Sequence, residues 1–141
     1  MEIKAFTPVP KEAVRIRNDV FVEEQGFMDE FDRWDDIATH LVAFEGEEPI
    51  GTCRVFYNDD EGKYMVGRFA VLPAYRGKKI GAKLMEEAER CVQKAGGSQL
   101  FLHAQCRAAG FYEKQGYEKM GEVEPEEGVP HIWMYKDVIR S

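Results

Sequence analysis

The chain is poor in the residues that stabilise disulfide-rich and zinc-bound small domains. Its 141 residues include only three cysteines, Cys53, Cys91 and Cys106. The number of cysteines is odd, and the sequence contains no Cys-x-x-Cys pair and no histidines at ligand spacing. These features argue against a disulfide framework or a metal site. We therefore expect free thiols in a reducing compartment, and a core that a domain of this length can bury without such links.

The chain also lacks a long apolar run and an excess of positive charge. No apolar stretch approaches the ~20 residues that span a bilayer, and the start of the chain lacks the basic-then-apolar pattern of a signal peptide. These absences predict a cytoplasmic location and no membrane partner. Lysine and arginine number 19 against 26 aspartates and glutamates, a net charge of −7. Because an acidic chain repels a phosphate backbone, we expect no nucleic-acid partner.

The hydrophobic pattern predicts one domain of mixed α+β fold over residues 1–141. An antiparallel meander is expected to run into one parallel strand–helix–strand crossover. The expected strands lie near residues 2–6, 40–44, 50–57, 64–72, 100–102, 117–123 and 131–138. The expected helices begin near Pro10 and cover residues 80–95 and 108–114. The continuous apolar run at 100–102 indicates a strand that is covered on both faces.

The turn between the strand near residues 64–72 and the long helix carries the most chemistry. It reads Arg76-Gly77-Lys78-Lys79-Ile80-Gly81. The first amides of a helix lack internal partners and its dipole favours an anion, while glycines let the backbone approach a phosphate closely. Neither a P-loop nor a dinucleotide fingerprint is present. The turn therefore predicts a pyrophosphate cradle, although a basic surface turn without a ligand would have the same composition.

This turn resembles the Gln/Arg-x-x-Gly-x-Gly/Ala motif of the GNAT acetyltransferase superfamily. Downstream, Leu102-His103-Ala104-Gln105 and the stretch from Ala108 to Tyr117 look like the later motif of the same family. The segments Ile16 to Gln25 and Gly128-Val129-Pro130-His131 resemble its small ElaA/YjcF-like bacterial branch. The resemblance covers nearly the whole chain. It implies the GNAT acyl-CoA N-acyltransferase fold, a mostly antiparallel mixed sheet flanked by helices.

The resemblance also implies an activity, the transfer of an acetyl group from acetyl-CoA to a primary amine of a small molecule. An amino sugar or a polyamine-like compound is one expected acceptor class, in a pocket built from the loops near residues 24–36 and 123–131. The pantetheine arm would lie between two splayed parallel strands, beside Phe69, Ala70 and Val71. The residues implied for the pyrophosphate are Arg76, Gly77, Lys78, Lys79, Ile80, Gly81 and Ala82.

One position departs from the family pattern, which usually has glycine where this chain has Lys79. If the backbone there needs a positive φ, lysine costs roughly 1 kcal/mol or more relative to glycine. If the position belongs to the first turn of the helix, lysine is tolerated. We expect the second arrangement.

The resemblance places Tyr112 at the position of the family's general acid, next to the coenzyme. A phenol can donate a proton to a thiolate of comparable basicity; from the pattern alone, Tyr112 would be a core aromatic. The candidates for the base that deprotonates the amine are Glu24, His103 and His131, acting directly or through water. Each of the three is equally well explained as a solvated or edge residue.

Two arginines lie within predicted strands, where charge is unusual. Arg54 and Arg68 could bind an anionic part of the substrate, but we expect them to form ion pairs with the acidic segment at residues 29–36.

The sequence is also compatible with two other functions. A non-catalytic CoA-binding regulatory module would keep the same turn without turnover, and a protein or peptide N-acetyltransferase would need a long groove. Exposed edge strands often pair, which favours a homodimer.

Overall fold

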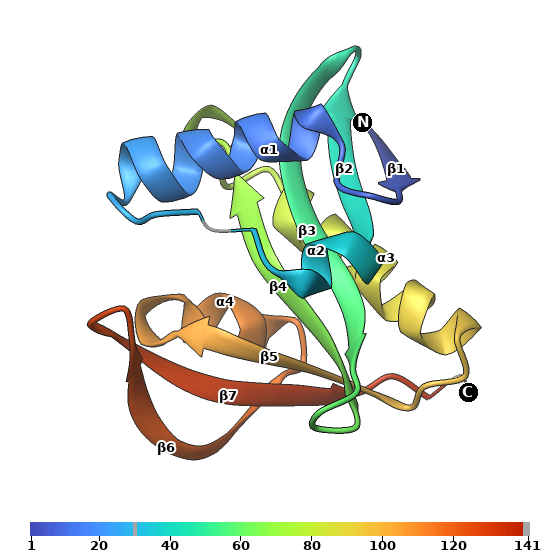
Figure 1. Cartoon of the computed structure of the whole chain (residues 1–141), viewed down its shortest axis with the longest axis vertical. Helices are drawn as coiled ribbons and strands as arrows, with labels where there is room; N and C mark the ends of the chain where they lie inside the picture. Colours follow the sequence, from blue (N-terminus) through green and yellow to red (C-terminus); the bar gives the residue numbers. More distant parts are fainter. Residues whose placement is uncertain (30, 140–141) are drawn as a thin grey trace.

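The computed structural model describes residues 1–29 and 31–139, which form a seven-stranded sheet in the order β1-β2-β3-β4-β5-β7-β6 (Figure 1). The strands are β1 (Glu2–Phe6), β2 (Thr39–Glu45), β3 (Glu48–Asn58), β4 (Lys63–Val71), β5 (Gln99–Gln105), β6 (Glu118–Glu126) and β7 (Val129–Asp137). The helices are α1 (Lys11–Arg17), η1 (Asn18–Glu24), α2 (Arg33–Ile37), η2 (Pro73–Tyr75), α3 (Ile80–Lys94), η3 (Cys106–Ala108) and α4 (Ala109–Lys114). None of the helices within these ranges is long and apolar enough to cross a membrane.

The predicted α+β fold is confirmed, including the antiparallel meander β1 to β4 and the single parallel pair of β4 with β5. Helix α1 starts directly after Pro10 and continues as the π-helical turns of η1. The acidic segment contains the short helix α2, which begins with a capping box. There Asp32 accepts hydrogen bonds from the backbone of Trp34 and Asp35.

Helices pack on both faces of the sheet. Strand β2 alternates, so Leu41 and Ala43 join the core under α3 while Val42 and Phe44 join the core under α1. Figure 1 shows α1 and α2 in front of the sheet and α3 behind it. The sequence supplies both layers because residues 41–44 of β2 are all apolar and point alternately to the two faces, while the apolar residues of α3 follow the period of 3.6.

The expectation that β5 is covered on both faces is wrong. Leu100 and Leu102 are buried, but Phe101 between them is only half-buried. Its ring stacks on Tyr135 of β7 at 6.0 Å between centroids, and the ammonium of Lys63 lies 4.7 Å from its centroid. A neighbouring ring and a long cationic side chain therefore cover this face of the strand, where the apolar run alone suggested a second packed layer.

Strand β4 carries a bulge and then separates from β5. Thr52 of β3 pairs with Ala70 and Arg54 pairs with Gly67, so Arg68 and Phe69 together face a single β3 residue. The backbone of Arg68 is left-handed, with φ 46°. In the described residues, β4 pairs with β5 only at Tyr64–Leu100 and Met65–Phe101. Beyond these two pairs the strands diverge and open a gap at the carboxyl end of β4.

A network of arginines and aspartates joins α1, the acidic segment and this bulge. Arg17 and Arg54, both almost fully buried, meet at the buried carboxylate of Asp35 with distances of 2.8 Å and 3.0 Å. The other ion pairs link Arg17 to Asp29 (2.9 Å), Arg54 to Asp32 (2.6 Å) and Arg68 to Asp29 (3.3 Å). The prediction that Arg54 and Arg68 pair with the acidic segment is confirmed, whereas Glu30 of that segment lies outside the described residues.

The network changes the acid–base behaviour of Asp35. Burial by itself would raise the pKa of this carboxyl, but the hydrogen bond from Arg17 and the charges of Arg54 and Arg17 outweigh burial and lower the pKa to about 2. A carboxylate with a depressed pKa stabilises the fold above the pKa of the unfolded chain, and this contribution is lost as the pH falls through the folded value.

We expect Asp35 to contribute on the order of 2 kcal/mol to the free energy of unfolding, lost as the pH falls from about 4 to about 2. Urea unfolding at closely spaced pH values measures this loss. In an Asp35→Asn variant, this part of the acid dependence should be absent. Stability at pH 7 should be lower by about 3–5 kcal/mol, since Arg17 loses a buried partner. Asp36→Asn removes an exposed neighbouring charge and should keep the native dependence; an unchanged dependence in Asp35→Asn would contradict the assignment.

Candidate active site

The amino end of α3 is open toward an anion. The cap position Lys79 makes no side-chain hydrogen bond, so no cap occupies the first amides of this 15-residue helix. Their N–H groups and the helix dipole favour negative charge at this end. Lys78 extends from the same turn, with its ammonium 5.5 Å from the centroid of the Tyr75 ring. Backbone donors and a positive charge therefore lie together at this end of the helix.

Lys79 does not lie in the first turn of the helix, so the expectation that it does is wrong. It precedes α3 with a left-handed backbone, φ 64° and ψ 14°. Gly77, two residues earlier, also has a positive φ, of 78°. The turn therefore uses two left-handed residues to direct the chain into α3. Only one of them is a glycine, which leaves strain of roughly 1 kcal/mol at Lys79.

The structure gives a packing reason for glycine at position 81, in addition to the close approach of a phosphate that the sequence suggested. A Cβ at this position would lie 3.0 Å from Phe111 Cζ and 3.2 Å from Phe69 Cζ. Glycine thus lets two aromatic rings pack against the first turn of α3. The side chain of Ile80 points into the core, so Ile80 can offer a ligand only its backbone.

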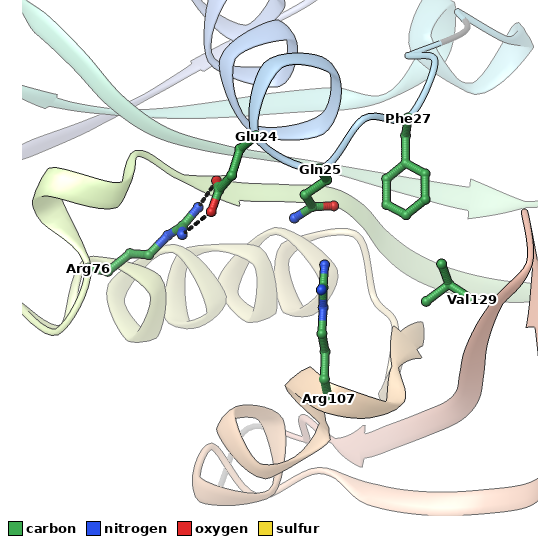
Figure 2. Close-up of a pocket in the computed structure, with 6 residues that line it drawn as sticks. All are labelled: Glu24, Gln25, Phe27, Arg76, Arg107 and Val129. Carbon is green, nitrogen blue, oxygen red and sulfur yellow. Dashed lines mark hydrogen bonds and ion pairs between the residues drawn. The ribbon is translucent and has the colours of Figure 1, made fainter.

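Arg76 connects the turn to the end of η1. Its Nε donates to the carbonyl oxygen of Val71 at 2.9 Å, and its two terminal nitrogens donate to the Glu24 carboxylate at 2.7 Å and 2.6 Å (Figure 2). The hydrogen bond from Arg76 is the main cause that lowers the pKa of Glu24 below its ordinary value. Glu24 is therefore a weaker proton acceptor than a free glutamate.

Phe69, Ala70 and Val71 line the β4 side of the gap between β4 and β5. Ala70 and Val71 pair with β3, so on the other side their backbone lies where β5 has already diverged. The ring of Phe69 contacts that of Tyr112 edge-on, with 5.9 Å between centroids. The bulge thus places the end of β4 next to the helix that carries the predicted acid.

Tyr112 lies in α4 and is buried, with 8% of its surface exposed. Burial is the main cause that raises the pKa of its phenol above the ordinary value. The hydroxyl therefore stays protonated throughout the neutral range, as a proton donor must.

The two histidines that the sequence singled out lie together on the face of the sheet opposite α3. The rings of His103 and His131 are 5.0 Å apart, and Glu126 lies within 3.4 Å of both. His131 Nδ1 is 2.8 Å from the carbonyl oxygen of Val129, and its Nε2 is 3.2 Å from Glu126. His103 lies between two carboxylates, with its Nε2 3.2 Å from Glu124. Both glutamates come from β6 and have no motif that could identify them from sequence.

A pocket of about 470 Å³ lies between the end of η1, the basic turn and the start of β7 (Figure 2). Its lining residues are Glu24, Gln25, Phe27, Arg76, Arg107 and Val129. These include residues of both loops in which the sequence predicted the acceptor pocket. Arg107 was not singled out from the sequence, where nothing distinguishes it from a solvated arginine.

A family model described as "Acetyltransferase (GNAT) domain" matches residues 9–138. YjcF of Bacillus subtilis strain 168, an uncharacterized N-acetyltransferase, is 35% identical to this chain over 130 residues. The match covers 90% of this chain and 91% of YjcF.

Two solved structures have the same fold. The crystal structure of Escherichia coli ElaA superposes with a TM-score of 0.84 at 28% identity, over 96% of this chain and 99% of ElaA. An aminoglycoside 6'-N-acetyltransferase complexed with coenzyme A gives a TM-score of 0.79 over 100% of this chain and 99% of that one. Its 18% identity shows the fold alone. On the family match and these relatives, the chain is an acyltransferase that belongs to the GNAT acetyltransferase family, in the branch of ElaA and YjcF.

Proposed function

We propose that this protein transfers the acetyl group of acetyl-CoA to a primary amine of a small molecule in the cytoplasm. The observation that carries the proposal is the uncapped, glycine-containing basic turn at the start of α3, which lies beside the gap between β4 and β5. In this assignment the backbone of residues 76–82 binds the pyrophosphate. The aminoglycoside 6'-N-acetyltransferase, a fold neighbour solved in complex with coenzyme A, supports the same use of the fold.

The pantetheine arm would occupy the gap beside Phe69, Ala70 and Val71, where the Val71 carbonyl already accepts from Arg76 Nε. An arm in this position brings the thioester to the middle of the sheet, close to α4 and Tyr112. The amine nitrogen attacks the thioester carbonyl carbon, and a backbone amide stabilises the oxyanion that forms. The C–S bond then breaks, and the coenzyme thiolate takes a proton from the Tyr112 hydroxyl.

Among the three candidate bases, we assign the proton acceptor to His131. When its Nδ1–H donates to the Val129 carbonyl at 2.8 Å, the proton from the amine would be taken up on Nε2. The carboxylate of Glu126, 3.2 Å from Nε2, then stabilises the imidazolium. Val129 also lines the pocket, so the same residue orients the base and contacts the acceptor space.

Glu24 and His103 fit the role of base less well. Arg76 already holds the Glu24 carboxylate with two hydrogen bonds. Both ring nitrogens of His103 face carboxylates, at 3.4 Å and 3.2 Å. The backbone carbonyl of Val129 fixes the tautomer of His131, whereas the two carboxylates beside His103 do not distinguish its ring nitrogens.

Coenzyme binding is the first test. Acetyl-CoA should raise the melting temperature in a concentration-dependent way, because it binds only the folded chain, and a thiol-release assay with a panel of primary amines should detect turnover. An Ala82→Glu variant places a carboxylate in the first turn of α3 and should weaken coenzyme binding at least about 10-fold. Ser98→Glu adds the same charge beyond the other end of the helix and should bind normally. If millimolar acetyl-CoA leaves the melting temperature unchanged, the proposal fails.

Removing the Tyr112 hydroxyl tests the acid. Tyr112→Phe should lower kcat by about 10²–10⁴-fold while the melting-temperature shift with acetyl-CoA is retained, since the ring packing remains. Steady-state thiol release at saturating coenzyme measures the effect. Tyr57→Phe, at an exposed tyrosine on β3, is the matched control, and full kcat in Tyr112→Phe at all pH values would remove the assigned role.

Substituting the histidines and Glu24 one at a time tests the base. His131→Gln should lower kcat/KM by about 10²-fold or more and flatten the rise of rate between about pH 5 and 8. His103→Gln and Glu24→Gln should keep that rise. If the rise disappears in His103→Gln or Glu24→Gln but persists in His131→Gln, the assignment of the base to His131 is wrong.

A further inference from the structure

Arg107 differs from most arginines of this acidic chain. Arg17, Arg33, Arg54, Arg68, Arg76 and Arg90 each form an ion pair with a carboxylate. Arg107 lines the pocket, and within residues 1–29 and 31–139 it has no carboxylate in ion-pair distance. The charge of Arg107 helps to lower the pKa of Glu24, but Arg76 already binds that carboxylate at 2.7 Å and 2.6 Å. Arg107 therefore keeps a positive charge beside the acceptor space that no carboxylate of the described residues contacts directly.

The guanidinium of Arg107 is held in a defined position. Its Nε donates to Gln105 Oε1 at 2.8 Å, and Gln105 Nε2 donates to Gln25 Oε1 at 3.3 Å across the pocket. One edge of the guanidinium is thereby anchored, and the two terminal nitrogens remain available to a ligand. Figure 2 shows the side chain extending from η3 across the pocket toward Gln25.

The charges of the pocket lining do not cancel. Arg76 and Glu24 neutralise each other through two hydrogen bonds, so Arg107 leaves the lining with one net positive charge. Phe27 and Val129 supply apolar surface, and the carbonyl of Val129 also binds His131. Such a pocket favours a ligand with one anionic group and an apolar body, and it disfavours a polycation such as a polyamine.

We propose that the acceptor is an amine that also carries a carboxylate, an amino-acid-like compound, and that Arg107 binds this carboxylate. The planar fork of an arginine matches the two oxygens of a carboxylate. With the carboxylate at Arg107, the α-amine on the adjacent carbon lies in the pocket whose wall includes Val129, the residue that holds His131. This inference rests on the proposed acetyl transfer and narrows its acceptor class.

Matched acceptors test the carboxylate in thiol-release assays at saturating acetyl-CoA. One series contains L-phenylalanine, L-phenylalaninamide and phenethylamine; another contains L-serine, serinamide, ethanolamine and O-phosphoethanolamine. The native protein should show a kcat/KM for the amino acids at least about 10-fold above that for the matching amides.

Arg107→Gln should raise KM for the amino acids by about 10–100-fold with kcat little changed, and should leave the kinetic constants for the amides unaffected. Arg15→Gln, at an exposed arginine on α1, removes the same charge outside the pocket and should behave as the native protein.

Binding provides a second measurement that does not need turnover. With coenzyme A present, calorimetry should detect N-acetyl-L-phenylalanine more strongly than N-acetylphenethylamine, and Arg107→Gln should abolish the difference. The inference is overturned if neither assay separates the carboxylates from their neutral analogues, or if Arg107→Gln affects all acceptors equally. It is also overturned if O-phosphoethanolamine is preferred to serine, or if Arg107→Gln weakens coenzyme binding itself. In contrast, the absence of any coenzyme-induced shift in the native protein would refute the proposed acetyl transfer.

Discussion

The buried ion pairs around Asp35 are the constraint on which the geometry of the site depends. Arg17 and Arg54 are almost fully removed from water, and a buried guanidinium is tolerated only when carboxylates compensate it. The acidic segment must therefore fold back onto α1 and the middle of β3. Because Arg68 joins the same aspartates, the segment is also tied to the bulge of β4. These ion pairs thus hold α1 and the acidic segment against β4, the strand that borders the gap to β5.

A second polar connection links the two halves of the proposed site. Arg76 of the basic turn donates to Glu24 at the end of η1, and Gln25, the next residue, accepts from Gln105 at the end of β5. The end of η1 therefore contacts both sides of the gap between β4 and β5. In the proposed mechanism, this arrangement makes the wall of the acceptor pocket and the phosphate cradle parts of one structure. In that mechanism, Arg76 and Glu24 are the residues through which the phosphate cradle contacts the wall of the acceptor pocket.

The proposed acid and the proposed base come from opposite faces of the sheet. Tyr112 packs with the core beneath α3, whereas His131 lies on the face that α1 and α2 occupy. A gap between β4 and β5 is the feature that lets groups from the two faces reach one thioester. The proposed proton donor is buried and neutral, and the proposed acceptor is partnered by an exposed glutamate. These two environments separate the roles by desolvation and by charge.

The sequence alone determined the elements of the fold, the basic turn and the family, because these depend on residues close together in the chain. The continuous apolar run of β2 and the apolar face of α3 predict their burial directly. Only the tertiary structure decided the left-handed backbone of Lys79, the packing reason for Gly81 and the half-covered face of β5. It also brought Glu126 to both histidines and placed Arg107 beside Gln25. Sheet register and packing bring such distant residues together, and local propensity acts over too few residues to encode the outcome.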